Sequence, residues 1–453
     1  MSFTTKSQKI ELGLTVLLTE KKDWIRGKSI GLITNHTGVD ATLQSNYRLF
    51  AAASSCRLSA IFSPEHGFWG AVQDGIAVNS LDVSDENASR RNEEIRRNTP
   101  LNATRANVIH CPASPHATCA TDFVYSQTKS SVDSHKTPHL TSVPVYSLYG
   151  QSVRPTARQL EDIDLLIYDI QDVGTRYYTY ISTLLHAMEA ASDHDIDFVV
   201  ADRPNPIACN AVEGPILESG FESFVGIHTV PVRYGLTIGE LATLLKMERV
   251  QGCRLNVAWM LGYERGMWYD DTGLQWVPPS PNMPTLTTST LYPGLCLFEG
   301  TNMSEGRGTT KPFEYIGAPW CNGEKWAETL NALSLPGVLF RPTVFTPAPV
   351  AETTKHAKQP CGGVAIHITD RERFLPVETA IYMLSTLTTE YGDHFVFRPE
   401  HFDRLAGNNW LRDALLDREP LDKIQARWTD ELQIWREKAK QFFNYSLRRN
   451  GGR

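Results

Sequence analysis

Short apolar runs rich in β-branched residues alternate along the chain with segments of helical periodicity. The clearest of these runs predict five strands, at Ser29 to Thr34, Leu58 to Phe62, Asp164 to Tyr168, Phe198 to Ala201 and Leu255 to Trp259. Helical spacing predicts helices at Thr156 to Ile163, Thr179 to Ala191 and Ile238 to Val250. Strands that alternate with helices are typical of βαβ units. We therefore predict an α/β fold with a doubly wound, mainly parallel sheet.

The pattern changes twice along the chain. From about residue 79 to 142, Ser, Thr, Asn, Arg and His predominate over a stretch too long for an ordinary loop, which predicts a polar, disordered insertion. Beyond Thr310 we predict helices at Trp326 to Leu333, Val377 to Tyr391 and Ile424 to Phe443, and a strand at Val364 to Thr369. The sequence thus predicts a first domain at 1–310, which carries the insertion, and a smaller α+β domain at 311–453.

Composition and charge narrow the partners and the compartment. A net charge of −7 argues against a nucleic-acid partner, because affinity for phosphate backbones depends on clustered Lys and Arg. The apolar stretch Leu12 to Leu18 is too short for a membrane span and lacks a cleavage pattern after it. We therefore expect a cytosolic protein with no membrane partner. The eight cysteines form no C-x-x-C pair and are interpreted as reduced thiols.

Several familiar motifs are missing from the sequence. It contains no G-x-G-x-x-G, no G-x-x-x-x-G-K-[ST] and no G-x-S-x-G, so neither a nucleotide cofactor nor a serine nucleophile is indicated. His135 and His139 have i,i+4 spacing, but Pro138 lies between them, and no metal site is predicted. We expect neither a cofactor nor a metal.

Polar segments follow the predicted strands at the points where a doubly wound sheet binds its ligands. These segments are Asn35 to Gly38, Ser63 to Gly67, Asp169 to Arg176 and Asp202 to Pro206. In the second of them, Glu65 stands on a turn behind Pro64, where partial burial would suit a carboxyl group to general acid catalysis. The alternative for Glu65 is a helix cap or an ion pair with an arginine. For Asp169 to Arg176 the alternative is an internal ion pair that orders the loop, and for Asp202 to Pro206 it is a structural turn.

One further segment combines charged side chains with a flexible backbone. Phe298 to Thr310 holds Glu299, Asn302, Glu305 and Arg307 among three glycines, which permit close approach of the backbone to a ligand. Aromatic pairs such as Tyr177 and Tyr178 stand close to carboxylates in the sequence, as sugar recognition requires, although a hydrophobic core also uses such residues.

Seven motifs occur in an order that resembles the exo-β-N-acetylmuramidase (NamZ) family of glycoside hydrolases. They are GLITNHTGVD from Gly31, SPEHG from Ser63, VYSLYG from Val145, DIQDVGTRYYTY from Asp169, DRPNP from Asp202, the loop Pro278 to Thr285, and Phe298 to Thr310. The resemblance covers nearly the whole chain outside the insertion. It implies a Rossmann-like domain, a smaller C-terminal domain, and release of terminal N-acetylmuramic acid from the non-reducing end of peptidoglycan fragments.

The resemblance also implies roles for individual residues. Glu65 matches the position of a general acid, and Glu305 or Glu299 would activate water or act as nucleophile, unless the 2-acetamido group of the sugar does so. Substrate contacts are expected from Asn35, His66, Asp169, Arg176, Tyr178, Asp202, Arg203, Asn205, Asn282, Glu299, Asn302 and Arg307. A planar guanidinium suits the lactyl carboxylate of N-acetylmuramic acid, with Arg176, Arg203 and Arg307 as candidates.

The sequence departs from the family pattern in its long insertion and in lacking an evident export signal, which leaves the natural substrate open. Two alternatives remain beside the muramidase. One is a non-catalytic sugar-binding protein on the same fold, and the other is a hydrolase of a different acetamido sugar. The oligomeric state is not predicted.

Overall fold

The computed structural model of the protein describes residues 10–73, 81–83 and 143–447. The predicted insertion, with His135 and His139, therefore lies outside the described residues except for the short strand β3 (Leu81–Val83). Residues 1–81 and 144–453 form one compact unit. The domain boundary that we place at residue 310 remains a prediction.

The main sheet of the described residues contains six parallel strands in the order β4-β2-β1-β5-β6-β9. Their bounds are β1 (Ser29–Thr34), β2 (Arg57–Ser63), β4 (Val143–Ser147), β5 (Leu165–Asp169), β6 (Asp197–Ala201) and β9 (Arg254–Ala258). The strand order reverses between β1 and β5, which lie side by side. Such a switch point opens a crevice at the carboxyl ends of the strands, where ligands bind.

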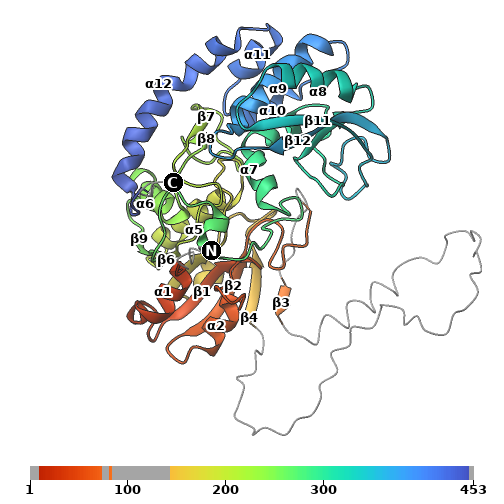
Figure 1. The fold of residues 1–453 in the computed structure, drawn as a ribbon. Helices are drawn as coiled ribbons and strands as arrows, with labels where there is room; N and C mark the ends of the chain where they lie inside the picture. Colours follow the sequence, from red (N-terminus) through yellow and green to blue (C-terminus); the bar gives the residue numbers. More distant parts are fainter. Residues whose placement is uncertain (1–9, 74–80, 84–142, 448–453) are drawn as a thin grey trace, which may run out of the picture. The chain divides into compact units, whose positions relative to one another are not determined.

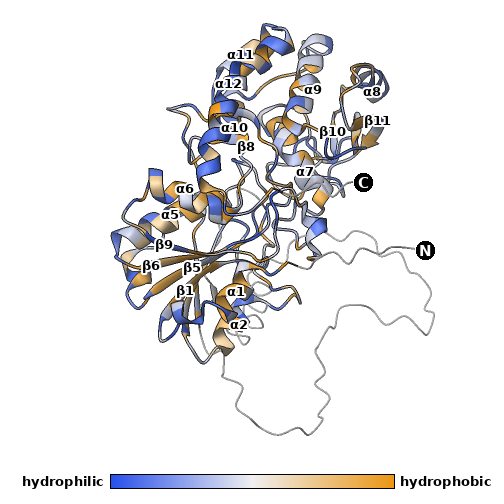
Figure 2. Ribbon diagram, turned by 60° about the vertical axis from the view of Figure 1, so that its left-hand side comes forward, coloured by the Kyte–Doolittle hydropathy of each residue, from blue (hydrophilic) through white to orange (hydrophobic). Residues whose placement is uncertain are grey.

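Helices cover both faces of this sheet, as Figure 2 shows with α5 and α6 on one face and α1 and α2 on the other. Their bounds are α1 (Gly13–Thr19), α2 (Asn46–Ala52), α4 (Ala157–Leu160), α5 (Tyr180–Asp193) and α6 (Ile238–Glu248). Burial on both faces explains why β5, with the sequence LLIYD, is apolar along almost its whole length. The capping box of Thr237 and Glu240 begins α6 as the sequence predicts.

A smaller antiparallel sheet in the order β10-β12-β11 follows in the second part of the chain (Figure 1). Its strands are β10 (Tyr315–Ala318), β11 (Val338–Phe345) and β12 (Cys361–Ile368). The helices of this part are α7 (Leu286–Leu295), α8 (Gly323–Ala332), α9 (Pro376–Glu390), α10 (Pro399–Ala406), α11 (Trp410–Leu416) and α12 (Leu421–Ala439). A hairpin of β7 (Glu213–Ile216) and β8 (Pro231–Arg233) completes the strands, and short 3-10 turns are η1 (Lys22–Trp24), η2 (Tyr269–Thr272), η3 (Cys296–Gly300) and η4 (Lys440–Phe442).

The α/β fold and the five strands predicted for the main sheet are confirmed, and every predicted end of these five strands lies within one residue of the observed end. The sequence pattern missed β11, whose run is broken by Pro342, a residue that normally argues against a strand. No helix in the described part of the chain is both long and apolar enough to cross a bilayer. The six cysteines there are free thiols.

Candidate active site

A cavity of about 420 Å³ receives residues from both parts of the chain. Its walls come from the segments that follow β2, β4, β5 and β7, from the loop before α7, and from the chain between the start of α7 and the end of α10. The lining residues are Glu65, His66, Tyr149, Tyr177, Tyr178, Thr179, Val225, Ser280, Asn282, Met283, Tyr292, Cys296, Glu299, Glu305, Arg307, Phe313, Thr353, Lys355, Arg398, His401 and Leu405. Of the predicted site residues, the structure therefore brings together Glu65, His66, Tyr178, Asn282, Glu299, Glu305 and Arg307.

Glu65 stands on a tightly constrained turn after β2. The next residue, His66, has a positive φ of 70°, which is uncommon for a residue with a side chain, and its Nδ1 lies 2.8 Å from the carbonyl oxygen of Val72. The Glu65 carboxyl group is buried, and its Oε2 accepts a hydrogen bond of 2.7 Å from the Thr179 hydroxyl. The carboxyl group of Glu65 is thus held at a defined position in the cavity. The sequence pattern did not indicate that Thr179 would hold it.

Two further carboxylates line the cavity, and cations surround both. Arg307 Nη1 lies 2.8 Å from Glu299 Oε1 and 3.6 Å from Glu305 Oε1. Lys355 Nζ lies 2.8 Å from Glu305 Oε2. Burial raises the pKa of Glu299, but the charges of Arg307, His401 and Lys355 outweigh burial and lower it to about 2. Glu299 is therefore ionised throughout the physiological range.

Aromatic rings supply much of the apolar lining. Tyr292 packs edge to face with Tyr177, Tyr178 and Phe313, at centroid distances of 5.6, 5.8 and 4.9 Å. Burial raises the pKa of Tyr178 above its usual range, so its hydroxyl remains neutral and able to donate. Rigid apolar faces beside carboxylates and a phenol hydroxyl can recognise a sugar ring and its polar substituents.

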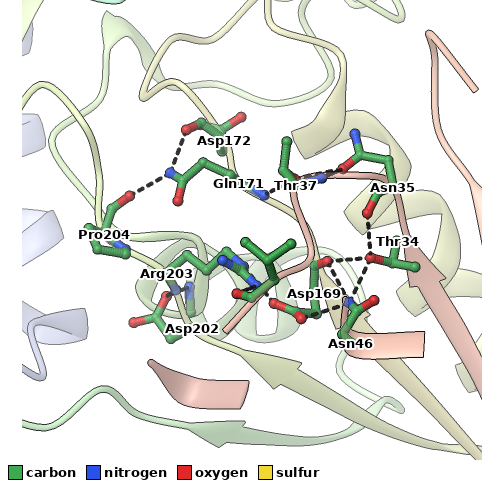
Figure 3. A network of polar contacts seen from close by, with 12 residues as sticks. Thr34, Asn35, Thr37, Asn46, Asp169, Gln171, Asp172, Asp202, Arg203 and Pro204 are labelled. Atoms are coloured by element: carbon green, nitrogen blue, oxygen red, sulfur yellow. Dashed lines mark hydrogen bonds and ion pairs between the residues drawn. The ribbon is translucent and has the colours of Figure 1, made fainter. Parts of the chain in front are cut away.

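Other predicted contact residues lie outside this cavity, in the polar network of Figure 3. Arg203 Nε donates to Asp169 Oδ1 at 2.6 Å, and Asn46 donates to the other oxygen of Asp169 at 2.7 Å. Asp202 accepts hydrogen bonds from Gly239 N and from the hydroxyl groups of Thr237 and Tyr445. These buried groups are satisfied within the protein, so we now interpret them as framework rather than as substrate contacts.

Arg176, another predicted contact residue, also lies outside the cavity. Its guanidinium is fully buried and donates to four carbonyl oxygens, those of Pro215, Val230, Leu405 and Ala406, at 2.7 to 3.0 Å. Burial lowers its pKa to about 10. The side chain joins the loop after β5 to the end of α10 and does not line the cavity.

The three predicted asparagines outside the cavity bind backbone or framework groups as well. Asn205 donates to Leu236 O at 2.9 Å, and Asn302 donates to His394 O at 2.7 Å. Asn35 donates to the Tyr180 hydroxyl, which in turn donates to Pro279 O at 2.6 Å. Asn35 therefore contributes to the site indirectly. Through Tyr180 it supports the proline-rich loop that brings Ser280 and Asn282 into the cavity.

The sequence pattern missed three basic lining residues, Lys355, Arg398 and His401. None lies in a motif or after a predicted strand, so no local signal was available. Within the described residues, no group of three or more His, Cys, Asp or Glu side chains is placed to hold a metal ion.

An α/β fold with acids and aromatic rings in a cavity at the strand ends is compatible with carbohydrate chemistry. The model of the exo-β-N-acetylmuramidase NamZ N-terminal domain matches residues 30–90 and 105–287, and that of the C-terminal domain matches residues 290–445. The chain belongs to this family of glycosidases.

Similarity to individual proteins is consistent with this membership. The chain is 40% identical over 443 residues to the peptidoglycan β-N-acetylmuramidase NamZ of Bacillus subtilis (strain 168), a match that covers 98% of this chain and 93% of that protein. Two crystal structures of DUF1343 family proteins from Bacteroides fragilis are similar. One has a TM-score of 0.78 at 33% identity and covers 97% of this chain and 99% of its own. The other has a TM-score of 0.70 at 27% identity, covering 97% and 100%.

Proposed function

We propose that this protein is an exo-β-N-acetylmuramidase that releases terminal N-acetylmuramic acid from the non-reducing end of peptidoglycan fragments. The observation that carries the proposal is the buried Glu65 carboxyl group, held by Thr179 in a cavity that also contains aromatic rings and cations. Glu65 protonates the glycosidic oxygen as the bond to the leaving group breaks.

Glu305 is the proposed second catalytic carboxylate. Its ion pairs with Lys355 and Arg307 present a charged oxygen, which is the form that a nucleophile or a base requires. Glu299 suits this role less well, because a pKa of about 2 makes it a weak base. The 2-acetamido group of the substrate is the alternative nucleophile. NMR of the anomeric configuration of the first product distinguishes inversion from retention. If the reaction is retaining, Glu305→Gln tests whether Glu305 is the nucleophile, because a reaction through the 2-acetamido group does not need this carboxylate as nucleophile.

The first test is hydrolysis of β-N-acetylmuramic acid glycosides by the protein and by Glu65→Gln. The amide oxygen that this substitution introduces can still accept the Thr179 hydrogen bond, so the fold is expected to persist, which thermal unfolding checks. With a natural disaccharide, which needs protonation of its leaving group, we expect kcat to fall about 10²- to 10⁴-fold. With a 2,4-dinitrophenyl glycoside, whose leaving group needs no proton, the first step should lose far less.

The matching N-acetylglucosamine glycosides identify the sugar. Cleavage of these substrates but not of the muramic acid glycosides would show a hydrolase of a different acetamido sugar. Binding without cleavage of either by well-folded protein would show a non-catalytic sugar-binding protein. An equal loss for both leaving groups in Glu65→Gln would contradict the role of Glu65 as acid. A cytosolic location remains a proposal from the sequence, which fractionation of the producing cells tests.

A further inference from the structure

Three arginine and lysine side chains line the cavity, and two of them are already engaged by the protein. Arg307 pairs with Glu299 and Glu305. Lys355 pairs with Glu305 and also donates to the carbonyl oxygens of Phe298 and Met303, both at 2.7 Å. His401 Nε2 lies 3.5 Å from Glu299 Oε2. The two carboxylates on this side of the cavity therefore already have Arg307, Lys355 and the His401 imidazole as partners.

Arg398 is the third of these side chains. Among the described residues, no hydrogen bond or ion pair of its guanidinium is found, and the side chain is exposed. It also lines a second hollow together with Pro399, Glu400, His401 and Arg404, so it borders both. A positive charge without an internal counter-charge at such a place is suited to an anionic ligand.

The backbone of Arg398 is fixed by hydrogen bonds, whereas its side chain is exposed. Its N–H donates to Gly300 O at 2.7 Å, and its carbonyl accepts from Phe402 N at 2.9 Å. A Cβ atom on Gly300 would lie 2.5 Å from Phe402 Cα, so α10 packs directly on the η3 turn. The guanidinium therefore extends from a fixed point beside the segment that carries Glu299 and Glu305.

We propose that Arg398 binds the lactyl carboxylate of the substrate and so selects N-acetylmuramic acid over N-acetylglucosamine. This inference rests on the proposed function. Only the lactyl ether carries a negative charge that distinguishes the two sugars, and a guanidinium can hold it with two parallel hydrogen bonds. Arg203, buried on Asp169, and Arg176, buried on four carbonyls, are no longer available for this contact.

The test compares binding of N-acetylmuramic acid with binding of its lactyl amide, a neutral analogue of the same shape, by calorimetry. Wild-type protein is expected to prefer the acid. Arg398→Gln should weaken binding of the acid about 10- to 100-fold, in line with the loss of a charged hydrogen-bonded pair, and leave the amide nearly unchanged. Arg398→Lys should recover part of the preference. Arg436→Gln, at an exposed arginine of α12 that lines neither hollow, is the matched control and should behave as wild type.

Hydrolysis of the acid and amide glycosides, measured in parallel, keeps this inference separate from the proposed function. Loss of preference in Arg398→Gln should appear mainly in KM, because the carboxylate is remote from the bond that breaks. An equal weakening of acid and amide, or an unchanged preference, would overturn the inference. Absence of hydrolysis by wild-type protein that still prefers the acid would instead overturn the proposed activity.

Discussion

Glu299 shows how strongly the surroundings of one side chain decide its chemistry. Its neighbours Arg307, His401 and Lys355 lower its pKa from 4.5 to about 2 in spite of burial. A carboxylate whose pKa is lower in the folded state stabilises the fold above the unfolded pKa. That contribution is lost as pH falls through the folded pKa.

We therefore predict that Glu299→Gln lowers the free energy of unfolding, and that the loss is smaller at acidic pH. The lowered pKa of Glu299 contributes roughly 3 kcal/mol to the free energy of unfolding at pH 6, and this contribution should decrease to roughly 2 kcal/mol at pH 3.5. Urea unfolding of both proteins at the two pH values measures the difference between them. Glu352→Gln, at an exposed carboxylate, is the control, and a difference independent of pH in Glu299→Gln would contradict the assigned environment.

Residue types after strands could be predicted from the sequence, but their roles could not. Asp169 ends β5, and Glu65 follows the end of β2 by two residues, at the same edge of the sheet. Glu65 enters the cavity, whereas Asp169 is neutralised by Arg203, from the end of the neighbouring strand β6. Which carboxylate meets an arginine depends on strand order, and strand order is a property of the folded sheet. Arg398 carried no local signal at all.

At the scale of elements, α10 is the helix on which the cation side of the cavity depends. Arg398 precedes it, His401 and Leu405 line the cavity from it, and its last carbonyls accept hydrogen bonds from Arg176. The helix has only eight residues, and the sequence pattern did not predict it. A short helix of this kind is stabilised by its tertiary contacts rather than by its own propensity.

We predict that Arg176→Met destabilises the protein by at least about 3 kcal/mol, because four buried carbonyl oxygens lose their donor. Where the variant is still folded, KM for the acid substrate should rise, since α10 is no longer held against the loop after β5. Chemical denaturation and steady-state kinetics provide the two measurements, with Arg404→Met as the control on the same helix. A large loss of activity at full stability would instead restore Arg176 as a substrate contact.

At the scale of the whole molecule, the end of the chain returns to the first sheet. After α12, Tyr445 donates to Asp202 Oδ2 at 2.5 Å and accepts a hydrogen bond of 2.9 Å from Met260 N. Asn444 N donates to Glu240 Oε1 at 3.0 Å. The last described residues therefore close a buried network with the carboxyl end of β6 and the first turn of α6. Alternation of strands and helices predicted this sheet, but no local pattern indicates that the chain returns to it.

The network also titrates. Burial raises the pKa of Asp202 to about 7, and the Tyr445 hydrogen bond opposes that rise. A carboxyl group whose pKa is higher in the folded state destabilises the fold as pH rises from the unfolded pKa through the folded one. The donated hydrogen bond of Tyr445 thus matters most when Asp202 is ionised.

We predict that Tyr445→Phe lowers the free energy of unfolding by about 2 to 4 kcal/mol at pH 8, because Asp202 loses a donor and Met260 N–H loses its acceptor. The cost should be smaller at pH 5, where Asp202 is protonated in the folded state. Denaturant unfolding at both pH values measures it, with Tyr382→Phe on α9 as the control. Both parts of the chain should still unfold together. An equal cost at the two pH values would show that Asp202 does not titrate in the folded protein, and the closing contact would then act through packing alone.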